Sequence, residues 1–360
     1  MKKKSFLILL FFCLLGAISS YSMDVELVDV VKLSQQKDFI QLPTSFAVTE
    51  DHLYFILDKK AANIKIYKPS GKLVKTFGRK GIGPNEFQEP RYIDYHQGRL
   101  AIMDLGTRKV YIYSRAGKND LKKEKDFLCI SLGDDLCING DRVMIAGYKT
   151  DQNDRPYSLY IRNYRNHKNE FLLPSEIKYG FGSVKEYQNE FRKNLKIVPI
   201  GIQSYFDWLG DDVYLVWQGN LRIIKINVRT KKRSFFGKHT QNYTQPKASQ
   251  KMINAYKRRD TREWLKERNK LCYVSDIFAA PEYIMVKYLR PGKGQGPQAL
   301  RARLQFYTPE GTFINEVELP RKEYNLYYFK RDEEILYALS LETTEELQEI
   351  YSIYRYKIVR

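Results

Sequence analysis

The chain has 360 residues, of which 43% are hydrophobic and 14% aromatic, so a disordered chain is excluded. Its length exceeds what one small core requires, which leaves a large closed repeat array or two domains. The formal net charge of +19 favours polyanionic partners such as anionic glycans or lipopolysaccharide. A solvated basic surface without a dedicated ligand explains the charge equally well.

The first 22 residues have the pattern of a secretory signal peptide. Three lysines at 2–4 precede an apolar run over 6–15, and small residues follow as far as Ser22. The run is too short to span a membrane, and we expect cleavage after Ser20 or Ser22, or near 17–19. Cys13 has no small residues before it, so we do not expect a lipoprotein. The expected mature chain is exported to the periplasm or cell exterior, without a transmembrane span, and monomeric.

Two stretches of sequence match each other at a fixed offset of 46 residues. Matched pairs are Asp58 with Asp104, Tyr67 with Tyr113 and Gly71 with Gly117. The first stretch contains four candidate strands, at 45–49, 53–57, 63–67 and 72–77, separated by polar turns. A four-stranded antiparallel unit with a period in this range is typical of a propeller blade.

The same pattern recurs in weaker form along the chain. Further units are expected at 91–127, 136–173, 205–236, 273–317 and 326–359. The last unit has only three strands, and the apolar stretch 25–31 is free to supply its fourth. We therefore predict an all-β fold over 23–360, a six-bladed β-propeller of four-stranded antiparallel blades whose ring is closed by the N-terminal strand. Five or seven blades would follow if one weak unit is miscounted.

Two insertions interrupt the repeat, near 175–199 and near 247–270. The second has a basic bias and a ragged apolar face at helical spacing, with Ser249 placed as an N-cap. We expect a short helical insertion that covers part of one propeller face.

The junction after the first unit reads Gly78-Arg-Lys-Gly-Ile-Gly-Pro-Asn-Glu-Phe87-Gln-Glu-Pro90 and leads into an inner strand. Glycines before a Phe, with a Pro three residues later, resemble the junctions of NHL-type β-propellers. With a signal peptide, the chain resembles the exported six-bladed NHL-like and TolB-like propellers of Gram-negative bacteria. The glycines predict a tight crossover between blades, since the stretch precedes a strand and lacks the P-loop ending.

The cysteine and histidine patterns indicate no metal site. Some NHL-type propellers are lyases with zinc held by histidines, but the histidines of this chain fall on different loops in the predicted register. They are His52, His96, His167 and His239. Cys129, Cys137 and Cys272 are expected to be buried, with a Cys129–Cys137 disulfide as the alternative. We predict no cofactor, and a divalent cation at the channel only if the protein is a metal-assisted enzyme.

Candidate ligand-binding residues lie where the second strand of each four-stranded unit ends. Asp58 and Asp104 follow equivalent strands and either bind a cation, act as acid and base, or cap their own loops. Gln218 replaces the aspartate in the fourth unit, which argues against a metal ring. A basic rim with nearby aromatic side chains is predicted on the same face, with a solvated rim as the alternative. Its members are Arg79, Lys80, Arg290, Lys293, Arg301, Trp217 and Tyr288.

The function that follows is an exported, non-catalytic binding propeller with a ligand at the channel mouth. The expected partner is an anionic glycan, a peptide or an envelope protein, and export disfavours nucleic acid. The alternative is a hydrolase or lyase at the central channel, which would use Asp58, Asp104 or residues without a linear motif.

Overall fold

A computed structural model gives the architecture for most of the chain. It describes residues 22–34, 38–117, 119–149, 157–173, 178–179, 182–183, 203–244, 246–292, 300–320, 326–330, 333–343 and 349–360. The predicted signal peptide before Ser22 and the binding candidate Lys293 lie outside these residues. So does most of the 175–199 insertion, of which only the short strands β16 (Lys178–Tyr179) and β17 (Gly182–Ser183) are described.

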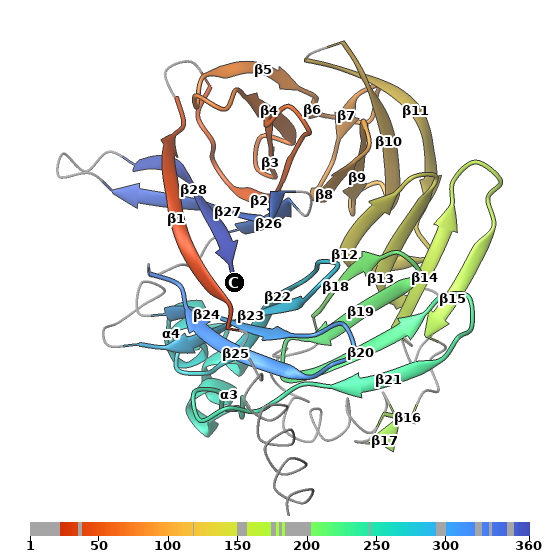
Figure 1. Cartoon of the computed structure of the whole chain (residues 1–360). Helices are drawn as coiled ribbons and strands as arrows, with labels where there is room; N and C mark the ends of the chain where they lie inside the picture. The colour runs from red at the N-terminus through yellow and green to blue at the C-terminus, as the bar shows by residue number, and fades with distance from the viewer. Residues whose placement is uncertain are drawn as a thin grey trace, which may run out of the picture.

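Six four-stranded antiparallel sheets form a ring, as predicted, and the region that their inner strands enclose is called the channel below (Figure 1). Blade one contains β2 (Pro43–Val48), β3 (Tyr54–Asp58), β4 (Asn63–Tyr67) and β5 (Leu73–Phe77). Blade two contains β8 (Pro90–His96), β9 (Arg99–Asp104), β10 (Lys109–Ala116) and β11 (Asp120–Leu128). Blade three contains β12 (Ser131–Asn139), β13 (Arg142–Lys149), β14 (Tyr157–Asn163) and β15 (Asn169–Leu173).

The remaining blades follow the same order. Blade four contains β18 (Ser204–Leu209), β19 (Asp212–Trp217), β20 (Asn220–Asn227) and β21 (Arg233–Phe236). Blade five contains β22 (Tyr273–Ala279), β23 (Ile284–Pro291), β24 (Leu300–Tyr307) and β25 (Phe313–Glu318). Blade six contains β26 (Leu326–Lys330), β27 (Ile335–Thr343) and β28 (Glu349–Val359), with β1 (Asp24–Lys32) outermost.

The middle strands are buried because each blade is covered on both sides by its neighbours. Every residue of β3 and β4 is buried, which explains the nearly continuous apolar sequence of β3. Aromatic rings fill the space between blades one and two: Phe55 meets Tyr95 edge-on at 5.8 Å, and Phe77 meets Tyr113 at 5.1 Å. The high aromatic content of the chain is used in these contacts between sheets.

The junction between blades one and two forms a compact loop with the short parallel strands β6 (Arg79–Lys80) and β7 (Glu86–Phe87). Phe87 is fully buried and packs against Phe77 and Tyr111. Gly78 has a φ of +85°, and a Cβ there would lie 2.5 Å from the Phe87 ring. The glycine is therefore required for a tight crossover, in agreement with the structural interpretation of this motif.

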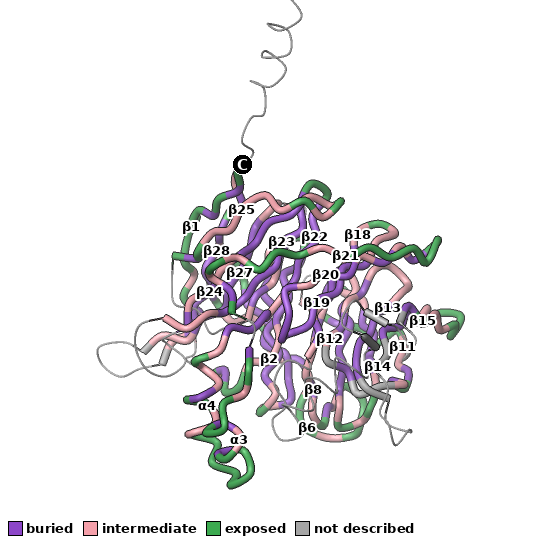
Figure 2. Tube along the Cα trace, turned by 90° about the horizontal axis from the view of Figure 1, so that it is seen from below, coloured by how far each residue is buried: buried purple, intermediate pink, exposed green. Residues whose placement is uncertain are grey.

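The insertion before blade five forms a helical hairpin of α3 (Gln250–Lys257) and α4 (Thr261–Arg268). Ser249 caps α3 as predicted, because its Oγ accepts a hydrogen bond from the Met252 N–H at 3.1 Å. The hairpin projects from the body of the propeller and does not lie flat on it (Figure 2). The expectation that this insertion covers a propeller face is therefore wrong.

Closure of the ring depends on β1, which pairs antiparallel with β28 along its whole length. Val25 faces the core between blades five and six and is 8% exposed, whereas Val28 on the same strand is 51% exposed. The N-terminal strand thus joins the last blade, which confirms the predicted closure.

Replacing Val25 with Asp should destabilise the protein by at least about 2 kcal/mol, because a carboxylate would enter an apolar contact between blades. Val28→Asp introduces the same charge on the exposed side of the strand and should change stability by less than about 0.5 kcal/mol. Chemical denaturation of both variants measures this difference. Equal stabilities would show that β1 does not close the ring.

Candidate functional site

Acidic side chains on the inner strands connect neighbouring blades around the channel. Asp94 Oδ2 accepts a hydrogen bond from the Ile138 N–H of the next inner strand at 2.8 Å. Asp207 Oδ2 accepts one from the Ala279 N–H at 2.8 Å, and Asp135 accepts one from blade four at 3.5 Å. Inner strands have no further strand beside them, so these carboxylates satisfy backbone groups that would otherwise be unpaired.

Burial favours the protonated form of several inner-strand carboxylates. It raises the pKa of Asp94 to about 6, and the nearby Asp207 adds to the shift. Burial also raises the pKa of Asp135 well above its ordinary value. In blade five, burial raises the pKa of Asp276. The positive charge of Lys287, which lies opposite on the next strand, reduces this shift. Asp94, Asp135 and Asp276 therefore hold their protons to a higher pH than ordinary aspartates do.

This pKa shift predicts that stability falls as the pH rises through about 6. The folded protein holds a proton on Asp94 that the unfolded chain releases nearer pH 4, so folding is favoured at about pH 5 over about pH 7.5. Asp94→Asn keeps an acceptor for the Ile138 N–H and carries no charge. It should reduce the loss of stability between these two pH values by about 1 kcal/mol.

Denaturant unfolding at the two pH values measures the effect of Asp94→Asn. Asp141 is the matched control, since its pKa is lowered by the hydrogen bond from Arg165, so it does not titrate in this range. Asp141→Asn should behave like the unmodified protein. If Asp94→Asn shows an unchanged pH dependence, the channel carboxylate is not protonated in the folded state.

Asp58 and Asp104 hold the loops that follow their strands. Asp58 is fully buried, and its two oxygens accept N–H groups from residues 41, 42, 60 and 61 at 2.7–3.2 Å. Asp104 is also fully buried and accepts N–H groups from residues 88, 89, 106 and 107 at 2.8–3.4 Å. Neither carboxylate has an exposed surface, so the geometry favours the capping role over ligand contact.

The aromatic candidates lie behind the surface of this face. Trp217 and Gln218 are each 6% exposed, and the backbone of Gln218 bonds to Gln203 and Val274 of neighbouring segments. Tyr288 is fully buried, and its ring packs edge-on against Tyr243 at 5.3 Å. These positions support the site from within, and a ligand at the surface would not reach them without rearrangement.

The predicted basic rim is divided between two places. Arg79 and Lys80 are exposed in the loop after blade one, where Arg79 Nε donates to Glu86 Oε1 at 2.7 Å. Arg290 and Arg301 belong to β23 and β24 of blade five, on the other side of the channel (Figure 1). The structure therefore does not bring the two halves of the rim together.

Arg290 and Arg301 stand directly opposite each other on adjacent antiparallel strands. Opposed cations destabilise a strand pair unless something neutralises them. Arg290 donates to a neutral amide, Asn242 Oδ1, at 2.7 Å. Within the described part of the chain, Arg301 makes no hydrogen bond or ion pair through its side chain. This pair is the strongest candidate anion-binding site in the structure.

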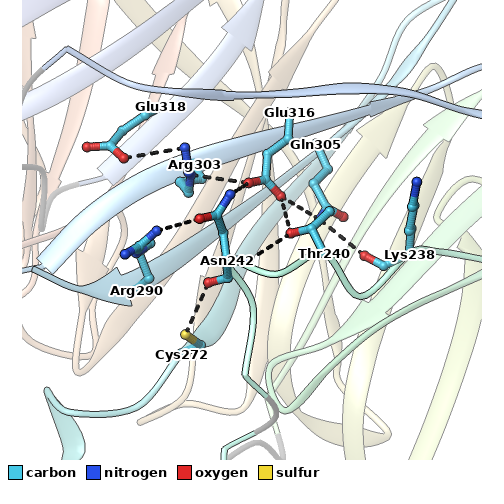
Figure 3. Close-up of polar contacts among 9 residues, drawn as sticks. All are labelled: Lys238, Thr240, Asn242, Cys272, Arg290, Arg303, Gln305, Glu316 and Glu318. Carbon is cyan, nitrogen blue, oxygen red and sulfur yellow. Dashed lines mark hydrogen bonds and ion pairs between the residues drawn. The ribbon is translucent and has the colours of Figure 1, made fainter.

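A buried polar network holds Arg290 in position (Figure 3). Glu316 on β25 is its centre, accepting hydrogen bonds from Asn242 Nδ2 and Gln305 Nε2 at 2.8 Å and from Thr240 Oγ1 at 2.7 Å. Asn242 then presents its oxygen to Arg290. The segment between blades four and five is thereby fixed against blade five, and the Arg290 guanidinium with it.

The acidic groups of this network pair with Arg303 and not with the two outer arginines. Burial alone would raise the pKa of Glu316, but hydrogen bonds from side chains including Gln305, Thr240 and Asn242 lower it below its ordinary value. Glu316 and Glu318 both pair with Arg303, at 3.2 and 3.5 Å. Neither carboxylate forms an ion pair with Arg290 or Arg301, and two acidic groups among three arginines leave this cluster with a net positive charge of one.

The structure separates the histidines and leaves the cysteines reduced. His52 approaches Glu333 at 3.4 Å, whereas His239 contacts Asn220 between blades four and five. In the part of the chain that the structure covers, no three His, Cys, Asp or Glu side chains are grouped to hold a metal ion. Cys129 and Cys272 are buried, Cys137 is partly buried, and none of the three is in a disulfide, so the alternative of a Cys129–Cys137 disulfide is wrong.

The family of this protein is established by comparison with family models. The model of the DUF5128 family, described as a 6-bladed beta-propeller, matches residues 19–267. Because this covers more than half of the chain, the protein belongs to that family. No curated protein matches the sequence.

Solved structures of low sequence identity share the fold. A member of the DUF4221 family from Bacteroides vulgatus superposes with a TM-score of 0.64 at 10% identity, covering 95% of this chain and 99% of the other. A protein from Bacteroides fragilis that bears the name "putative exported protein" gives a TM-score of 0.57 at 14% identity, covering 95% of this chain and 97% of the other. The PQQ-bound aldose sugar dehydrogenase of Streptomyces coelicolor gives a TM-score of 0.52 at 9% identity, covering 94% of this chain and 98% of the other. These likenesses concern the fold alone.

No helix among the described residues has the length and apolar character needed to cross a bilayer. The basic helical hairpin is too short and too polar for that purpose.

Proposed function

We propose that this protein is an exported, NHL-like binding propeller that recognises anionic groups of a glycan or envelope partner through Arg290 and Arg301. The observation that carries this proposal is the pair of arginines opposite each other on adjacent strands. Among the described residues, the side chain of Arg301 makes no hydrogen bond or ion pair. Export is supported by the signal-like first 22 residues, and the Bacteroides fragilis protein of the same fold that is named a putative exported protein is consistent with it.

The chemistry of the pair favours a carboxylate or sulfate as the recognised group. A guanidinium presents parallel N–H donors that match two oxygens of such an anion, and two adjacent guanidinium groups can share one anion. Asn242 and Glu316 pre-position Arg290, so less side-chain entropy is lost on binding. Repeating uronate or sulfate groups on a glycan, or acidic side chains on an envelope protein, have this chemistry.

The best probes are acidic oligosaccharides, such as oligogalacturonate and heparin-derived fragments, with an uncharged maltooligosaccharide for comparison. Calorimetric titration should detect salt-sensitive binding of an acidic probe. Arg290→Gln combined with Arg301→Gln should weaken it at least about tenfold, since a hydrogen bond to a charged group contributes about 1.5–3 kcal/mol.

The matched control is Arg79→Gln combined with Lys80→Gln, which removes the same charge across the channel. It should leave the affinity within about twofold of the unmodified protein. If the two double variants lose affinity equally, general charge attraction explains the binding and the arginine pair is not the site.

A further inference from the structure

A second cationic surface lies on the helical hairpin formed by α3 and α4. The buried Met252 packs with Ile253, Trp264 and Leu271 inside the hairpin, so the hairpin has a small core of its own. Arg268 connects it to blade five by stacking over Tyr273 at 4.9 Å. The hairpin therefore has a defined shape and attachment.

The acidic side chains of the hairpin are used within it. Asp260 Oδ1 caps α4 by accepting the Glu263 N–H at 3.0 Å. Glu263 pairs with Lys251 at 2.8 Å, and the buried Glu267 accepts the Ser249 hydroxyl at 3.0 Å and pairs with Lys270. Among the described residues, none of these carboxylates forms an ion pair with the cations at the tip.

Five exposed cations at and near the tip make no ion pair with any residue that the structure describes. They are Lys257, Arg258, Arg259, Arg262 and Lys266. Two exposed apolar side chains accompany them: Tyr256 is 45% exposed and Leu265 is 37% exposed. Arg262, Leu265 and Lys266 have i, i+3, i+4 spacing, so they share one side of α4.

The hairpin projects from the face opposite the C-terminus, with its tip farthest from the blades (Figure 2). A flat surface can therefore contact the tip before it contacts the body of the propeller. We propose that the tip of the hairpin binds the surface of an anionic lipid bilayer. The cations would pair with lipid phosphates, while Tyr256 and Leu265 would enter the interface, as in peripheral amphipathic helices.

Tyr256 and Leu265 favour a bilayer over a soluble polyanion. A polyanion would use the cations alone, and its binding would be lost completely in high salt. Exposed apolar side chains beside the cations add a contribution that salt does not screen. This surface is separate from the Arg290–Arg301 pair, so either proposal can fail without the other.

The test is sedimentation with vesicles of phosphatidylglycerol in phosphatidylcholine, using the chain from Ser22 onward, which contains every strand of the closed ring. The unmodified protein should bind these vesicles and not pure phosphatidylcholine. A variant with four tip cations replaced by glutamine should bind at least about tenfold more weakly. Its changes are Lys257→Gln, Arg258→Gln, Arg259→Gln and Arg262→Gln.

A control variant loses the same charge from exposed, unpaired lysines of blades one and two and should bind vesicles like the unmodified protein. Its changes are Lys60→Gln, Lys68→Gln, Lys72→Gln and Lys122→Gln. Tyr256→Ser with Leu265→Ser should weaken binding and remove the fraction that persists in high salt. Equal loss in the two quadruple variants, or binding to soluble heparin without binding to vesicles, would overturn the proposal.

Discussion

Each blade of this propeller buries both of its faces only when a neighbour stands on either side, so the fold depends on closure of the ring by β1 against β28. Without that strand, the last blade would keep an unpaired edge beside a large apolar interface. Closure also places the end of the second strand of every blade on the same face of the ring. This face carries the Arg290–Arg301 pair and the helical hairpin. The functional surfaces proposed for this protein are consequences of that constraint.

The blades, their closure and the capped helix could be predicted because they rest on local patterns. The matched Asp58 and Asp104, the alternating strands and the N-cap Ser249 are signals within a few residues of one another. Their agreement over several repeats made the fold class predictable. The same repetition indicated that the aspartates cap loops, and the buried carboxylates have that geometry.

The site could be predicted only in part, because it is assembled from distant segments. The cross-strand position of Arg290 and Arg301 follows from the register of blade five, but Asn242 and Glu316 support it from a connecting segment and an outer strand. Sequence reasoning missed both, as it missed the inner-strand Asp94. An aspartate recurs within the inner strands β8, β12, β18 and β22. This repetition was the signal in the sequence for the channel carboxylates.

We propose that the ligand binds on blade five, away from the repeated aspartates and the first junction loop. Hydrogen–deuterium exchange around the whole ring, measured with and without an acidic oligosaccharide, locates the bound ligand. Exchange should slow at the ends of β23 and β24 and in residues 238–242. Slowed exchange centred on the loop at 78–87 or on the inner strands would contradict it.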